Sequence, residues 1–98
     1  MSTESRPKFT TVQMTITNAS EWYTLPAIKV GDGCEVVVKS SANNTAPLMV
    51  AHNDDNSKNT PFILDNPGDS ISLRIKNTDQ IVISSEVPDQ VIEVITEQ

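Results

Sequence analysis

Cysteine and histidine, a common pairing of nucleophile and base, occur once each in this sequence, as Cys34 and His52. A cysteine nucleophile needs a base beside it, and these two residues are far apart in the sequence. One thiol cannot close a disulfide within the chain. We expect Cys34 to be a small apolar residue that faces a core, with a nucleophile or an intermolecular bridge as the alternatives.

The longest polar stretch begins at His52 and ends at Thr60, with the sequence HNDDNSKNT. Its carboxylate and amide oxygens are potential calcium ligands, but the order Asp-x-Asp-x-Asp-Gly with a downstream Glu is missing. Zinc takes three or four ligands, and the sequence has no second histidine to join His52. Asn and Asp are common in loops for reasons of turn geometry alone. We therefore expect a surface loop that binds no metal.

Other catalytic motifs are also missing from the sequence. It has no Gly-x-Ser-x-Gly elbow, no Cys-x-x-Cys, no His-Glu-x-x-His and, with 3 glycines in all, no glycine loop for a phosphate. Acidic residues are numerous, but no pattern pairs two of them across a cleft as a glycosidase requires. We predict that the protein is not an enzyme and that it binds no cofactor.

The charge balance limits the classes of partner. Lys and Arg total 7 against 13 Asp and Glu, which gives a net charge of −6. A surface of this sign repels phosphate backbones and anionic lipids. No apolar run approaches the roughly 18 residues of a membrane span, and the polar first residues, up to Lys8, lead into no secretory signal. We expect no nucleic acid and no membrane as a partner.

Alternating apolar and polar residues predict half-buried strands. The first covers 9–17, where every second residue from Val12 to Ile16 is apolar among threonines. The same alternation predicts strands over 34–40, with Cys34 on the apolar face, and over 71–76. Between them, the sequence Asn-Pro-Gly-Asp at 66–69 predicts a type II turn, because proline presets φ at its second position and glycine supplies the positive φ of the third.

Two β-branched runs near the end of the sequence, at 82–85 and 90–95, carry apolar residues on both faces. Successive side chains of a strand face opposite ways, so such runs are typical of central rather than edge strands. We predict that the two runs pair with each other near the middle of a small sheet.

Altogether the sequence predicts about eight short strands spaced by turn signals, which is typical of all-β domains. We predict a single small antiparallel β-sandwich or jelly-roll-like domain over 9–98, with little or no helix. Residues 1–8 are polar and are predicted to form a flexible N-terminal arm.

The only Trp and the only Tyr are adjacent, Trp22 and Tyr23, in a short predicted strand that Pro26 ends. Large aromatic side chains mostly serve cores, so one interpretation is an aromatic plug at the end of a sandwich. The other is an exposed platform for a sugar ring or a protein partner. Because neighbours in a strand face opposite ways, we expect one of the two to lie nearer the surface.

Three features, in order along the chain, carry a resemblance: Trp22-Tyr23-Thr24-Leu25-Pro26 after a threonine-rich strand, the turn at 66–69 leading into Ile-Ser-Leu, and the closing runs at 81–85 and 90–95. In this pattern the chain resembles small β-sandwich virion proteins of tailed bacteriophages. That resemblance covers most of the sequence.

The resemblance implies a non-enzymatic structural role as a capsid decoration or cement protein on the outside of the head shell. It implies binding to the major capsid protein or another virion protein, a trimer or hexamer, and a location on the virion after synthesis in the host cytoplasm. The candidate interaction residues are Arg6, Pro7, Lys8, Phe9, Trp22 and Tyr23. A tail or baseplate accessory protein and a carbohydrate-binding module that uses Trp22 or Tyr23 are the alternatives.

Overall fold

The computed structural model describes residues 9–54 and 57–98 of the chain. Within these residues it contains eight strands and two short 3-10 helices, η1 (Ser57–Asn59) and η2 (Thr78–Gln80). The strands are β1 (Phe9–Ile16), β2 (Tyr23–Thr24), β3 (Val36–Ser40), β4 (Leu48–His52), β5 (Phe62–Leu64), β6 (Ser70–Leu73), β7 (Ile81–Ser84) and β8 (Gln90–Glu97). The predicted all-β fold with little helix is confirmed.

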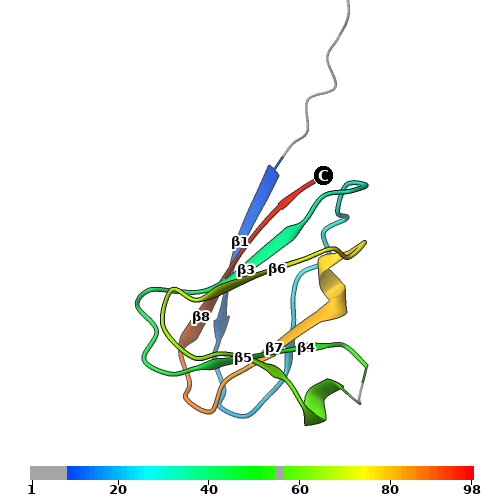
Figure 1. Ribbon diagram of the computed structural model, residues 1–98. Helices are drawn as coiled ribbons and strands as arrows, with labels where there is room; N and C mark the ends of the chain where they lie inside the picture. Colours follow the sequence, from blue (N-terminus) through cyan, green and yellow to red (C-terminus); the bar gives the residue numbers. More distant parts are fainter. Residues whose placement is uncertain (1–8, 55–56) are drawn as a thin grey trace, which may run out of the picture.

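The strands form two antiparallel sheets that lie face to face (Figure 1). Sheet A has the order β1-β8-β3-β6, and sheet B has the order β2-β7-β4-β5. The chain crosses between the sheets after nearly every strand, and β4 and β5 are the consecutive strands that pair directly. This order is that of a jelly roll, a double-sheet architecture built from two Greek keys.

One predicted pairing is wrong. The runs that contain β7 and β8 are central strands, as predicted, but they lie in different sheets. β7 pairs with β2 and β4, whereas β8 pairs with β1 and β3. The segment from Ser85 to Asp89 is not a hairpin turn but a crossing between sheets. Asp89 takes a left-handed conformation there (φ 67°), and its N–H donates to the carbonyl of Ile16 at the end of β1 (2.7 Å).

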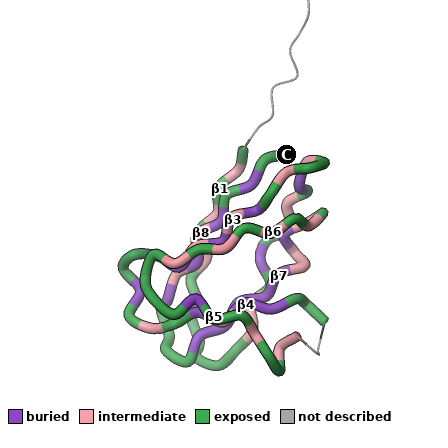
Figure 2. The backbone as a smooth tube through the Cα atoms, in the orientation of Figure 1, coloured by how far each residue is buried: buried purple, intermediate pink, exposed green. Residues whose placement is uncertain are grey.

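The core fills the space between the two sheets. Along β3 and β8 buried residues alternate with more exposed ones, as the period of two requires (Figure 2). Ile16, Val36, Leu48, Ile83 and Ile92 have no exposed surface at all, and they come from strands of both sheets. In β7 all four residues are buried, which agrees with its central place in sheet B.

Turn and strand boundaries follow the sequence with three adjustments, the first of which is that the strand expected over 71–76 is β6 and ends at Leu73. Gly68 has φ of 90°, and the N–H of Asp69 donates to the carbonyl of Asn66 (3.0 Å), which confirms the predicted turn. The strand expected from Cys34 begins two residues later, at Val36, because Cys34 still belongs to the turn: its N–H donates to the Gly31 carbonyl (3.0 Å). The strand expected over 22–26 shortens to β2.

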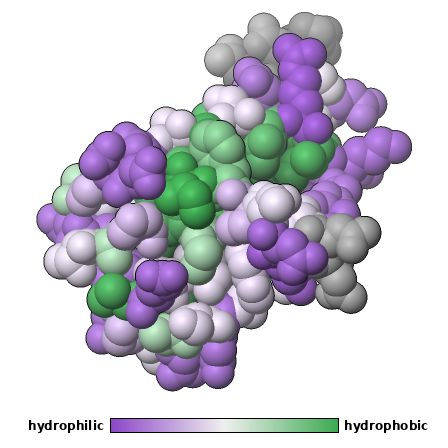
Figure 3. All heavy atoms as spheres, turned by 60° about the horizontal axis from the view of Figure 1, so that its bottom comes forward, coloured by the Kyte–Doolittle hydropathy of each residue, from purple (hydrophilic) through white to green (hydrophobic). Residues whose placement is uncertain are grey.

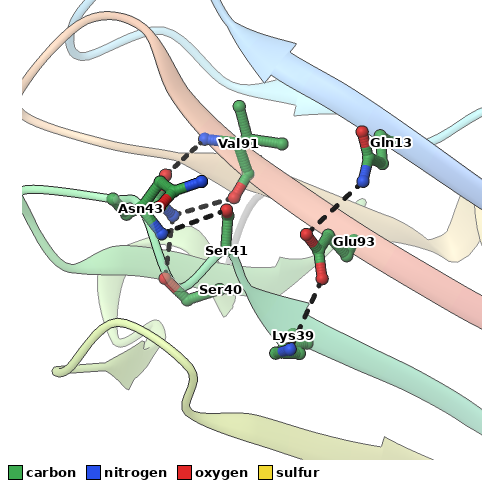
Figure 4. A network of polar contacts seen from close by, with 8 residues as sticks. Gln13, Lys39, Ser40, Ser41, Asn43, Val91 and Glu93 are labelled. Carbon is green, nitrogen blue, oxygen red and sulfur yellow. Dashed lines mark hydrogen bonds and ion pairs between the residues drawn. The ribbon is translucent and has the colours of Figure 1, made fainter.

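A cluster of buried amides fixes the loop that follows β3 (Figure 4). The side chain of Asn44 imitates a strand neighbour of β8: its Nδ2 donates to the Val91 carbonyl (2.8 Å), and its Oδ1 accepts from the Val91 N–H (2.7 Å). The same Nδ2 donates to the Ser40 hydroxyl (2.8 Å). Gln90, also buried, accepts from the N–H groups of Thr45 and Ala46. The side chains of Asn44 and Gln90 thus take the place of a neighbouring strand as hydrogen-bond partners of these backbone N–H and C=O groups.

No helix in the described residues has the length and hydrophobicity needed to cross a bilayer.

Candidate functional site

The predicted interaction residues fall into three groups. Arg6, Pro7 and Lys8 lie outside the described residues. Phe9 is the first residue of β1 and is the most exposed of the large hydrophobic residues, at 68%. Trp22 and Tyr23 follow the other end of β1, whose eight residues span about 24 Å from Phe9 to Ile16. The structure therefore separates the predicted residues into two places instead of one site.

Phe9 borders a shallow hollow on the outer face of sheet A. The hollow has a volume of about 500 Å³ and is lined by Phe9, Cys34, Val37, Ile95 and the neighbouring Gly33, Glu35, Thr96 and Glu97. Ile95 is 42% exposed, and its backbone pairs with Thr11 on one side and Val37 on the other. Phe9, Val37 and Ile95 thus form an apolar group on the outside of the domain, here called the Phe9 surface.

A polar row borders the Phe9 surface (Figure 4). Gln13 on β1 donates to Glu93 on β8 (3.4 Å), and Lys39 on β3 forms an ion pair with the same carboxylate (3.6 Å). The three residues share one register across the sheet. Lys39 and Glu93 are partly exposed, so the pair contributes little to stability, but it offsets the negative charge of Glu93 on this face.

Cys34 also lines the hollow beside Phe9. It is half-buried and packs against the hydrophobic core, which fits the expected role of a small apolar residue. Its thiol makes a long contact with the carbonyl of Asp32 (3.8 Å).

Tyr23 has a structural role. Its ring packs against the core, and its hydroxyl accepts a hydrogen bond from the N–H of Asn18 (2.9 Å). Both ends of the side chain are therefore engaged, as expected for an aromatic plug. Trp22, one residue before β2, is half-buried like Tyr23. Tyr23 packs on the core, and the expectation that one of these two neighbours lies nearer the surface stays a prediction.

A second hollow, not predicted from the sequence, opens between the β5 and β6 edges of the two sheets. Its volume is about 510 Å³, and its apolar lining includes Phe62, Ile71, Leu73 and Ile75 above the buried Val50 and Ile81. In Figure 3 hydrophobic residues form a band across the middle of the face shown, with hydrophilic residues on both sides. We call this hollow the β5–β6 cleft.

The polar loop after β4 lies at the rim of the β5–β6 cleft. The Asp54 N–H donates to His52 Nδ1 (3.1 Å), and the Ser57 hydroxyl donates to the main-chain carbonyl of His52 (2.9 Å). Since the serine hydroxyl contacts the backbone and not the imidazole, these side chains are not arranged as a nucleophile and its base. Among the described residues no group of three or more His, Cys, Asp or Glu side chains could hold a metal ion.

Sequence reasoning missed the β5–β6 cleft because its walls come from strands that are neighbours only in the folded sandwich. The alternation at 71–76 correctly placed Ile71, Leu73 and Ile75 on one face. One signal was available in the sequence: Pro61 comes directly before the short run that forms β5, and proline is typical of edge strands. The first residue of β5, Phe62, is indeed exposed at this edge of the sandwich.

No family model matches this chain, and no curated protein matches it. A solved structure does: a de novo designed double-stranded beta-helix, determined by solution NMR, is similar with a TM-score of 0.52 and 19% sequence identity. The similarity covers 93% of this chain and 99% of the design. At this identity the likeness concerns the fold alone, and it agrees with the two-sheet architecture described above.

Proposed function

We propose that this protein is a non-enzymatic structural protein of a tailed-phage virion, of the head decoration or cement type. In this role it binds the major capsid protein or another virion protein on the outside of the shell and stabilises the shell as a homo-oligomer. The proposal draws on the resemblance in the sequence, and the jelly-roll fold is compatible with it because capsid proteins use this architecture.

The observation that carries the proposal is the Phe9 surface. An aromatic ring that is 68% exposed lies beside the exposed Ile95, at the residue where residues 1–8 join the domain. Full burial of such a side chain contributes about 1.5–3 kcal/mol to association. Exposed aromatic residues that enter a partner's pocket are the usual centres of protein–protein binding energy.

The outer face of sheet A suits protein contacts in a second respect. Its exposed positions on β1 are Phe9, Thr11, Gln13 and Thr15, all uncharged, and Glu93 is paired with Lys39. Few charges of β1 and of the polar row then have to lose their hydration when a partner covers this face, whereas Glu35 and Glu97 at the hollow are exposed acids. A partner surface of apolar and uncharged polar residues, with a cationic or hydrated part opposite these two acids, is the chemistry that fits.

A second candidate function is the binding of a small apolar ligand in the β5–β6 cleft. Its volume of about 510 Å³ lies in the range of ligand sites, and its lining is mainly apolar. The geometry of Tyr23 does not favour a carbohydrate module built on this residue, because the ring packs on the core and its hydroxyl is already bonded, which leaves Trp22 as the other candidate platform.

The deciding experiment compares Phe9→Ser with Phe62→Ser, which removes a 55%-exposed ring of the same type at the β5–β6 cleft. Purified virions of the encoding phage are analysed for this chain by mass spectrometry, and heads that lack it are then titrated with each variant. We expect Phe9→Ser to bind heads at least about tenfold more weakly and Phe62→Ser to bind like the wild type.

Absence of the chain from purified virions would refute the virion role. Equal binding of the Phe9 variant and the wild type would refute the assignment of the Phe9 surface as the contact. Binding of an apolar probe that Phe62→Ser abolishes and Phe9→Ser leaves intact would support the second candidate.

A further inference from the structure

The backbone of β8 determines which groups of β1 remain free. The N–H of Val91 donates to the side chain of Asn44, and its carbonyl accepts from the N–H of Ser41 (3.1 Å). Both partners follow β3, so the peptide groups of Val91 point toward β3. Peptide groups of an antiparallel strand alternate in direction, so those of Ile92 and Val94 point toward β1.

The register then defines the free edge. Ile92 and Val94 are paired with Met14 and Val12, whose N–H and C=O groups therefore face β8. The peptide groups of Thr11, Gln13 and Thr15 point away from β8, toward the side of sheet A where the described chain has no strand. Each of these residues offers one donor and one acceptor to an incoming strand.

Among the edge strands of the described chain, β1 is the least protected against such pairing. Natural edge strands are kept short, or are flanked by charges and prolines. In sequence Pro7 and Lys8 precede β1, but the strand is eight residues long, and from Phe9 to Ser20 the sequence has neither a charged residue nor a proline. The other edges are short and flanked as follows: β2 by Glu21 and Pro26, β5 by Pro61 and Asp65, β6 by Asp69 and Arg74.

Incomplete burial on the inner side of β1 also favours the addition of a strand at this edge. Val12 and Met14 face inward and touch the core but are only half-buried. The edge strand of sheet B on this side of the sandwich, β2, has two residues, so it covers only a small part of β1. A strand added beside β1 would extend the sheet and cover these two side chains further.

We propose that a second copy of this chain pairs antiparallel with β1 along its free edge, so that the two A sheets join into one continuous sheet. A two-fold axis at Val12 brings this residue next to Val12 of the partner subunit. The same register sets Thr11 opposite the partner's Gln13 and Thr10 opposite the partner's Met14, so that peptide donors and acceptors of both edges meet.

A second copy fits this edge better than a strand of a different protein for two reasons. Antiparallel pairing of a strand with itself is self-complementary, and every copy brings the same free edge. Such pairing normally fails when like charges meet across the axis. Here β1 has no charged residue, and the nearest acid in the central register, Glu93, is paired with Lys39 at 3.6 Å.

The test uses substitutions that affect the edge but not the fold. Thr11→Pro removes an N–H that β8 does not use, and proline is tolerated at such edge positions. The matched control is Ser72→Pro on β6, the opposite edge of the same sheet. The peptide groups of Ser40 bond to Gly68 and Asp69 on the β6 side, so the alternation leaves those of Ser72 pointing outward. A second pair of variants, Thr11→Lys and Ser72→Lys, tests the same two edges with a positive charge instead of a proline.

Solution mass is measured by light scattering from about 1 μM to about 1 mM, with melting curves to verify that each variant is folded. We expect wild-type mass to reach twice the 10.7 kDa of one chain, or an even multiple if further contacts exist. Both Thr11 variants should raise the dissociation constant of this contact at least about tenfold, and both Ser72 variants should leave it unchanged. If Thr11→Pro fails to fold, the lysine pair decides.

Wild-type protein that stays monomeric over the whole range would overturn the inference. So would an oligomer that the Thr11 and Ser72 variants weaken equally, or that none of them affects. The inference does not depend on the virion role: a chain found in virions that is monomeric in solution would contradict the β1 pairing and leave the proposed binding to a virion protein intact.

Discussion

Replacing Asn44 by alanine should destabilise the domain more than any other single change in a loop. Asn44 is buried, and its amide makes three hydrogen bonds: two with the backbone of Val91 and one with the Ser40 hydroxyl, at 2.7–2.8 Å. A net contribution of about 1 kcal/mol for each bond gives a loss of about 3 kcal/mol in the free energy of unfolding. In a domain of this size the melting temperature should fall by about 10–20 °C.

The neighbouring Asn43 supplies the control. Asn43 is exposed, and its backbone N–H donates to the Ser41 hydroxyl (3.3 Å). Alanine retains this N–H group. Asn43→Ala should therefore change the unfolding free energy by less than about 0.5 kcal/mol. Urea unfolding followed by Trp22 fluorescence measures both variants under the same conditions. If Asn44→Ala stays within about 0.5 kcal/mol of Asn43→Ala, the argument that this amide replaces a strand neighbour is refuted.

Three further predictions concern the core, a buried hydroxyl and the surface ion pair. Ile83→Ala removes a fully buried side chain and should lower the unfolding free energy by about 2–5 kcal/mol, whereas Ile95→Ala at an exposed position should change it by less than about 1 kcal/mol. Thr78→Val keeps the shape of the side chain but removes the hydroxyl that accepts a hydrogen bond from the Ile28 N–H (2.8 Å). Chemical denaturation should therefore show that the free energy of unfolding falls by about 1–3 kcal/mol. Lys39→Ala should change stability by less than about 1 kcal/mol at low salt and less still at high salt; a larger, salt-independent loss would contradict the view that the ion pair is screened.

The positions of most strands could be predicted because their signals are local. The alternation in β1 and β3 follows directly from side chains that face a core or water, and the turn at 66–69 follows from what proline and glycine allow. The pairing of strands is not local in this sense. β7 and β8 are both apolar on two faces, which indicates a central place but not a particular sheet, and Ser85–Asp89 has the composition of a hairpin turn although it crosses between sheets.

The same distinction applies to the candidate sites. Phe9 could be singled out because a large apolar residue stands next to a polar segment, and its exposure is a property of one position. Its apolar neighbours Val37 and Ile95 could not be assigned to the same surface, because only the pairing of β8 with both β1 and β3 brings them together. For Tyr23, the hydrogen bond from Asn18 that occupies its hydroxyl depends on how the turn after β1 folds back.

The order of sheet A also affects how this chain folds as it is synthesised. Of the eight strands described, β8 is the last to leave the ribosome, yet it is the shared neighbour of β1 and β3. Until then β1 has neither of its edges paired, and the pairs closed earlier in sheet A are those of β3 with β6. Long-range pairing of this kind slows folding and prolongs the exposure of uncharged strand edges. A ribosome-bound chain that ends before Gln90 should therefore lack the β1–β8 and β3–β8 pairs of sheet A, remain sensitive to proteases over β1, and gain protection there in one step once β8 has emerged.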